Sequence, residues 1–100
     1  MKPADFLRQG IELVEGDRAA THGDLYRNHQ NIATMWNAFL SIRRDPAAPL
    51  GPDDVAIMGD LLKIARTQLG EWNKDDYTDG ATYMGCAGAL SWMMRNGETD

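Results

Sequence analysis

The stretch that decides the fold is residues 24–43, DLYRNHQNIATMWNAFLSIR. Its apolar side chains recur three and four residues apart, which places them on one face of an α-helix. They are Leu25, Ile32, Met35, Trp36, Phe39 and Leu40. Asp24 precedes them, and its carboxylate is suited to accept from the free N–H groups of a first helical turn. The stretch therefore predicts a helix over about 25–43 with Asp24 as its cap.

Two more helices are predicted on either side of this stretch. Pro3 and Pro52 suit the first turn of a helix, because proline lacks the N–H that would stay unpaired there. The apolar spacing that follows them predicts helices over about 4–18 and 52–69. Gly70 ends the second of these, as glycine commonly does.

A fourth helix is predicted over about 77–95, where Asp76 and Asp79 make an approximate capping box. This helix is apolar or small nearly all round, and such a helix is buried in a bundle or against another chain. Its glycines weaken it unless another backbone or a ligand comes close. They are Gly80, Gly85 and Gly88. We therefore expect a homo-oligomer.

The chain shows no strand or hairpin pattern, so it is predicted to be all-α, a four-helix bundle in a single domain over residues 1–100. The formal net charge of −5 argues against a general nucleic-acid binder. One local basic pocket for a phosphorylated small molecule remains compatible with that charge.

The sequence also bears on the compartment of the protein. Cys86 is the single cysteine, so no intramolecular disulfide can form, and a reducing compartment follows. No signal peptide and no apolar stretch of about 20 residues is present. We expect a cytoplasmic protein without a membrane partner, and burial among small apolar residues is expected to leave Cys86 inert.

Polar side chains at the start of the helix over 25–43 are the first candidate site. At about 100° per residue, Asn28 and His29 project onto the apolar side. Two interpretations are open: they bond to nearby loop backbone, or they line a ligand site at a helix N-terminus, which favours anions. His22 and Asp24 would belong to the same site.

The helix over 52–69 carries a second candidate. Lys63 and Arg66 lie three residues apart with Gly59 one turn earlier, and two cations beside a small residue can form a notch for phosphate. The alternative is an ordinary surface pair whose aliphatic stems cover apolar surface.

The third candidate is the segment DDYTDGATY, residues 75–83. Asp79 and Tyr83 fall on one face, with Cys86 continuing it inward. Asp79 is expected either to form a salt bridge with Lys63 or Arg66 between the two helices, or to act as a metal-binding or catalytic carboxylate.

Three elements in this order, HGD…N, LLKIAR and DxxDxxxY, resemble a family of small phage and prophage proteins of unknown function. The resemblance covers about residues 16–90. It implies the cytoplasm of a host cell as the location and carries no activity.

The helical layout and the string MGDLLKIA also resemble, more distantly, all-α nucleoside triphosphate pyrophosphohydrolases of the MazG type. Those enzymes hold Mg²⁺ with an ExxE pair and an ExxD pair. Asp60 matches the last aspartate, but Ile57 stands where its partner is needed, and Asp60 projects toward the polar side of its helix. Glu12 and Glu15 form an ExxE pair that is predicted to face solvent.

Three functions therefore stay open. The favoured one is a nucleotide-binding protein that sequesters a phosphorylated ligand, such as a signal of host defence, without a cofactor. The second is a Mg²⁺-dependent pyrophosphohydrolase with Asp24, Asp60, Asp76 and Asp79 as metal ligands. The third is a structural or partner-binding oligomer. The predicted ligand-binding residues are His22, Asp24, Asn28, His29, Lys63, Arg66, Asp79 and Tyr83.

Overall fold

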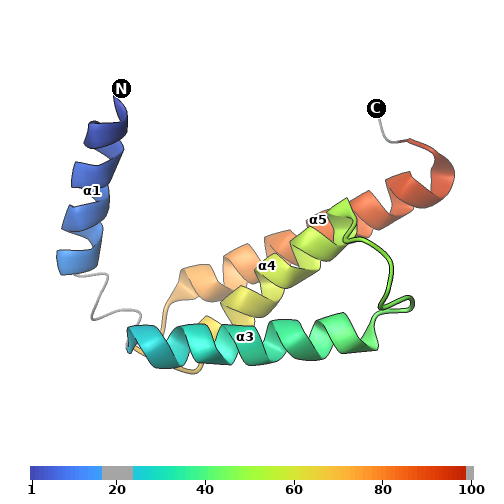
Figure 1. Ribbon diagram of the computed structural model, residues 1–100, viewed down its shortest axis with the longest axis horizontal. Coiled ribbons are helices and arrows are strands. Elements are labelled where there is room, and N and C mark those ends of the chain that lie inside the picture. The colour runs from blue at the N-terminus through green and yellow to red at the C-terminus, as the bar shows by residue number, and fades with distance from the viewer. Residues whose placement is uncertain (17–23, 99–100) are drawn as a thin grey trace.

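The structure, a computed structural model, describes residues 1–16 and 24–98. It contains four helices, α1 (Pro3–Glu15), α3 (Leu25–Ile42), α4 (Pro52–Arg66) and α5 (Lys74–Asn96) (Figure 1). No strand occurs among the described residues. The predicted all-α class and the four helices are confirmed, with helices packed as in a bundle.

The sequence predicted the N-terminal cap of α3 correctly and that of α5 incorrectly. Asp24 caps α3, because its Oδ1 accepts from the N–H of Arg27 at 2.7 Å, as predicted. For α5 the predicted capping box of Asp76 and Asp79 is wrong. Asn73 is the cap, with its Oδ1 accepting from the N–H of Asp75 at 2.9 Å, so α5 starts earlier and Asp76 lies inside its first turn.

The helix ends also differ from the prediction. The last helical residue of α1 is Glu15, and residues 17 and 18, which the prediction included, lie outside the described residues. α4 ends at Arg66 and not at Leu69. The Thr67 hydroxyl donates to the Ile64 carbonyl at 2.6 Å and the Gln68 N–H to the Ala65 carbonyl at 3.2 Å. These bonds tighten the chain into turns and stop the helix.

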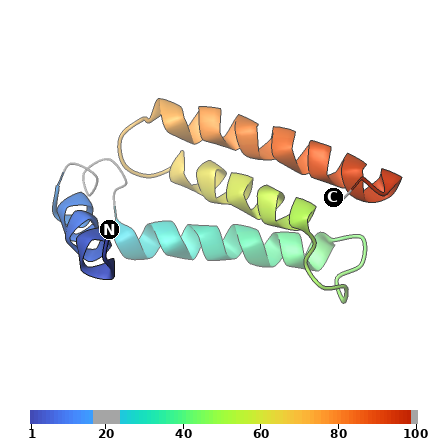
Figure 2. The same ribbon diagram turned by 90° about the horizontal axis from the view of Figure 1, so that it is seen from above.

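α4 lies between α3 and α5 and packs against both (Figure 2). Ala56 and Ala65 are its buried residues, and Trp36 of α3 donates its indole N–H to the Met58 carbonyl at 2.8 Å. α5 approaches α4 closely, because a Cβ at Gly80 would come within 2.8 Å of the Asp60 Oδ1. The close approach predicted at Gly80 is therefore found.

α1 stands apart from the layer formed by α3, α4 and α5 (Figure 1). Its apolar side chains are more than half exposed, namely Phe6, Leu7, Ile11, Leu13 and Val14. Core residues are few: Ile32, Ala56, Ala65 and Ala87 are the buried hydrophobic ones. None of the described helices is long and apolar enough to cross a membrane.

Candidate functional site

The start of α3, the end of α4 and the start of α5 lie at the same end of the helical layer (Figures 1 and 2). Each contributes one polar side chain to this end: Asn28, Arg66 and Asp76. We call it the Asn28 end. The chain reaches this arrangement because α3 and α5 both run antiparallel to α4, which brings two helix starts beside one helix end.

Polar atoms at the Asn28 end are buried without partners. Asn28 is 4% exposed and Asp76 is 5% exposed. The Oδ1 of Asn28, the Oδ1 of Asp76 and the Nε of Arg66 are buried and have no hydrogen-bond partner within the described chain. An unpaired buried polar atom costs about 1–3 kcal/mol. Native proteins keep few of them, so three on neighbouring helix ends call for an explanation.

A cavity of about 260 Å³ opens between α4 and α5 beside Asp76, and neither Asn28 nor Arg66 belongs to its lining. It is lined by Asp60, Ile64, Thr67, Asp76, Tyr77, Gly80 and Ala81. The two carboxylates in this lining come from different helices. Burial raises the pKa of the Asp60 carboxyl above its ordinary value of 3.8. The prediction that Asp60 faces the polar side of its helix is wrong, because the missing side chain at Gly80 lets α5 cover it.

Lys63 forms an interhelical ion pair with Asp79, with 2.9 Å between Nζ and Oδ2. The Lys63 side chain is 14% exposed and that of Asp79 is 50% exposed. Of the two interpretations of Asp79, the structure supports the salt bridge.

The predicted phosphate notch beside Gly59 is occupied by the ring of Tyr83. A Cβ at Gly59 would lie 2.8 Å from that ring, so α5 packs there directly on α4. That part of the prediction is wrong, and Arg66 remains the cation with a buried, unpaired nitrogen.

The two histidines do not build the site as expected. His29 is exposed and its Nδ1 lies 2.8 Å from the Leu25 carbonyl, so the prediction that it faces inward is wrong. Among the described helices α3 packs mainly on α4, and of the neighbouring residues Asn28 and His29 only Asn28 is buried. His22 lies outside the described residues, and Asp24 is exposed.

Two further predictions concern side chains away from this end. Glu12 and Glu15 are exposed, as predicted. Cys86 is also exposed, so the prediction of a buried thiol is wrong. The reason is that the buried residues of α5 are Asp76, Gly80 and Ala87, and Cys86 lies outside this buried set.

Among residues 1–16 and 24–98, no group of three histidine, cysteine, aspartate or glutamate side chains is placed to hold a metal ion. The candidate ligands Asp24, Asp60, Asp76 and Asp79 therefore do not form one set. Asp24 caps α3 and Asp79 pairs with Lys63, which leaves Asp60 and Asp76 together in the cavity.

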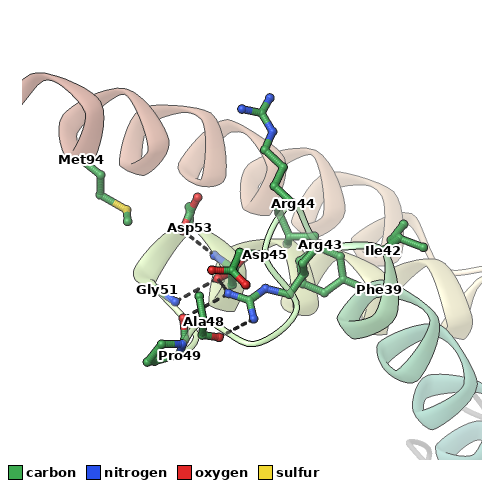
Figure 3. Close-up of a pocket in the computed structure, with 12 residues that line it drawn as sticks. Phe39, Ile42, Arg43, Arg44, Asp45, Ala48, Pro49, Gly51, Asp53 and Met94 are labelled. Carbon is green, nitrogen blue, oxygen red and sulfur yellow. Dashed lines mark hydrogen bonds and ion pairs between the residues drawn. The ribbon is translucent and has the colours of Figure 1, made fainter.

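A second cavity, of about 480 Å³, lies at the opposite end of the layer, around the loop that joins α3 to α4 (Figure 3). Arg43 organises this Arg43 end. Its guanidinium donates to the carbonyls of Ala48 and Pro49 at 2.7 and 3.1 Å and to the Asp54 carboxylate at 2.8 Å. Sequence reasoning missed this network, although an arginine before a short proline-rich loop and an aspartate after it hint at such a bridge.

The fold and the site together define a small all-α protein with one polar end at which buried atoms of the described residues are incompletely paired. The chain belongs to the family described as a domain of unknown function (DUF6378), whose model matches residues 5–91.

Two curated relatives are phage proteins. The Gene 55 protein of Mycobacterium phage L5 is 39% identical over 79 residues, which are 79% of this chain and 47% of the relative. The Gene 55 protein of Mycobacterium phage D29 is 30% identical over 80 residues, 80% of this chain and 49% of the relative. The chain thus spans about half the length of these relatives. No solved structure matches it. The predicted resemblance to a phage family of unknown function is confirmed.

Proposed function

We propose that the protein captures a phosphorylated nucleotide at the Asn28 end and does not cleave it. One observation carries the proposal: Asn28, Arg66 and Asp76 present buried polar atoms without partners at one end of three helices. A ligand that bonds to these atoms offsets the cost of their burial.

The chemistry of the three atoms fits a nucleotide. The Nε–H of Arg66 is a charged donor, which suits a phosphate oxygen. The Oδ1 atoms of Asn28 and Asp76 are acceptors, which suit the N–H groups of a base or the hydroxyls of a ribose. A nucleotide offers both kinds of group within one molecule, whereas inorganic phosphate offers few donors. Since the matched relatives are phage proteins, nucleotide signals of host defence belong in the set of ligands to test.

A second candidate function is Mg²⁺-dependent cleavage of a nucleotide, as in the all-α pyrophosphohydrolases. It is favoured by one observation, the presence of the Asp60 and Asp76 carboxylates in the same cavity. Two carboxylates with substrate phosphates can bind Mg²⁺, although enzymes of this chemistry bring more of them together. Mg²⁺ binding needs the ionised carboxylate, and burial, which raises the pKa of Asp60, makes that form more costly.

A thermal-shift screen over linear and cyclic nucleotides, with and without Mg²⁺, tests the proposal. We expect at least one nucleotide to raise the melting temperature of the full chain, because a ligand that binds only the folded state stabilises it. Arg66→Ala is expected to abolish the shift and to stay folded. Arg44→Ala is the matched control, since Arg44 is exposed and lies at the Arg43 end.

The same samples separate capture from cleavage when they are analysed for released pyrophosphate or monophosphate. Capture predicts a melting shift with unchanged nucleotide. Turnover that Asp76→Asn abolishes would instead establish the enzyme. If no nucleotide of the panel raises the melting temperature and none is cleaved, both functions are refuted.

A further inference from the structure

The chain leaves more surface exposed than a folded monomer of its size does. Its accessible surface is 7501 Å² for a mass of 11.1 kDa. Monomeric proteins of that mass expose about 5,700 Å². The surplus is larger than the roughly 800 Å² that each partner contributes to a standard protein interface. Part of it belongs to α1, which stands apart from the other helices, and part to large apolar side chains of α5, including Trp92, Met93 and Met94.

The side of α5 that faces away from α4 carries two glycines followed by a tryptophan. We call Gly85, Gly88 and Trp92 the outer stripe. They are spaced by three and four residues, so they share one face of the helix, and all three are exposed. α5 uses a different set, Asp76, Gly80, Tyr83 and Ala87, against α4.

The two glycines of the outer stripe have no role within the described chain. A Cβ placed on Gly85 or on Gly88 would meet nothing within 4 Å. Glycine destabilises the interior of a helix relative to alanine, so its use there calls for a reason outside the monomer. On the face of α5 that packs against α4, the lack of a side chain at Gly80 allows these two helices to touch.

The charge distribution points to another copy of the same chain as the occupant. No charged residue occurs in α5 between Asp79 and Arg95, although the chain has a net charge of −5. Two copies of an acidic protein repel one another, and an uncharged face is where this repulsion opposes their close association least. The outer stripe is such a face, and its small residues let two helix backbones approach.

We propose that two copies of the chain pair through the outer stripes of their α5 helices. The small residues of each stripe receive the Trp92 ring or the backbone of the other. The interface lies on the far side of α5 from α4, so it forms independently of nucleotide binding at the Asn28 end.

Light scattering during size-exclusion chromatography tests the proposal on the full chain. We expect a mass of twice 11.1 kDa at tens of micromolar protein. The double variant Gly85→Gln, Gly88→Gln is expected to run as a single chain, because the added side chains block the approach of the helices. This variant raises helix propensity, so loss of the dimer cannot be ascribed to unfolding.

The matched control is Gly10→Gln, which places the same side chain at a helical glycine of α1 that also has open surroundings. It is expected to stay dimeric. The melting temperature should rise with protein concentration in the wild type and in the control, and not in the double variant. A monomeric wild type, as would result if α1 folded over its own α5, overturns the proposal. So does a dimer that survives in the double variant.

Discussion

The two ends of the helical layer differ in whether their buried polar groups are hydrogen-bonded. At the Arg43 end, the guanidinium of Arg43 is bonded to two carbonyls and to Asp54, and the Gly51 N–H also donates to Asp54 at 2.9 Å. At the Asn28 end, three buried atoms have no partner among the described residues. Both ends join helices by short connections, so the difference does not follow from topology.

The difference separates two uses of buried polarity. A fully bonded network fixes a loop, and removal of one member costs stability because its partners are left unpaired. An incompletely bonded cluster makes the free protein less stable than it would otherwise be, and this cost is recovered when a ligand binds. Substitutions at the two ends should therefore change stability in opposite directions.

The largest effect is expected at the Arg43 end. Arg43→Met should lower the free energy of unfolding by about 3 kcal/mol, because it leaves a mostly buried Asp54 carboxylate without its cation. Urea denaturation of both proteins measures this difference. Arg44→Met, a neighbouring exposed arginine, should change stability by less than about 0.5 kcal/mol. Equal effects of the two substitutions would show that the Arg43 network does not stabilise the fold.

The opposite sign is expected at the Asn28 end. Asn28→Leu replaces a buried amide by an apolar side chain of similar size, so it should raise the free energy of unfolding by about 1 kcal/mol. The same variant should lose the nucleotide-induced melting shift. Chemical denaturation without ligand, followed by the thermal-shift screen, checks both halves. A destabilised Asn28→Leu would mean that the amide is bonded in solution and that the two ends are alike.

A smaller effect is expected for the ion pair of Lys63 and Asp79. A double-mutant cycle with Lys63→Met and Asp79→Asn should give a coupling energy of about 0.5 kcal/mol, because the Asp79 carboxylate is half exposed. Added salt should reduce it further. A coupling above about 2 kcal/mol would place this pair with the Arg43 network as a structural element.

The smallest effect concerns Asp60 and depends on pH. Its pKa is raised in the folded protein by burial, so ionisation of Asp60 opposes folding. Below the ordinary value of 3.8 the carboxyl is neutral in both states and the cost is absent. It develops as the pH rises through the folded pKa. Asp60→Asn should therefore melt slightly above the wild type at pH 7, and this difference should shrink as the pH falls to 3. A difference that grows toward low pH would mean that Asp60 accepts a stabilising bond.

Local sequence signals predicted the helices well and the inward-facing residues only in part. Asp24 was correctly predicted as a cap, because capping depends on residues that are close in sequence. Its carboxylate accepts from the N–H of Arg27, three residues away. The start of α5 was misplaced because Asn73 and Asp76 are both good caps. Asn73 is the cap and Asp76 is buried inside the first turn, and the local sequence does not reveal that burial.

The same limit applies to the candidate site. Asn28 was predicted from its projection onto the apolar side of its helix and Arg66 from its place near Lys63 and Gly59, and the structure places both at the Asn28 end. Asp76 was considered as a helix cap and as a metal ligand, and its burial was not foreseen. His29 was expected inside because the helical projection placed it on the apolar side of α3, and Cys86 because α5 was expected to be surrounded.

The central claim is that the unpaired atoms of the Asn28 end bind a nucleotide, and Arg66 and Arg43 allow its most direct test. The side-chain Nε–H resonances of Arg66 and Arg43 can be followed by ¹⁵N NMR while nucleotides from the thermal-shift panel are titrated into the full chain. The Arg66 signal should move and reach saturation at the same nucleotide concentration as the melting shift, whereas the Arg43 signal should stay in place. An Arg66 signal that no member of the panel moves would contradict the account.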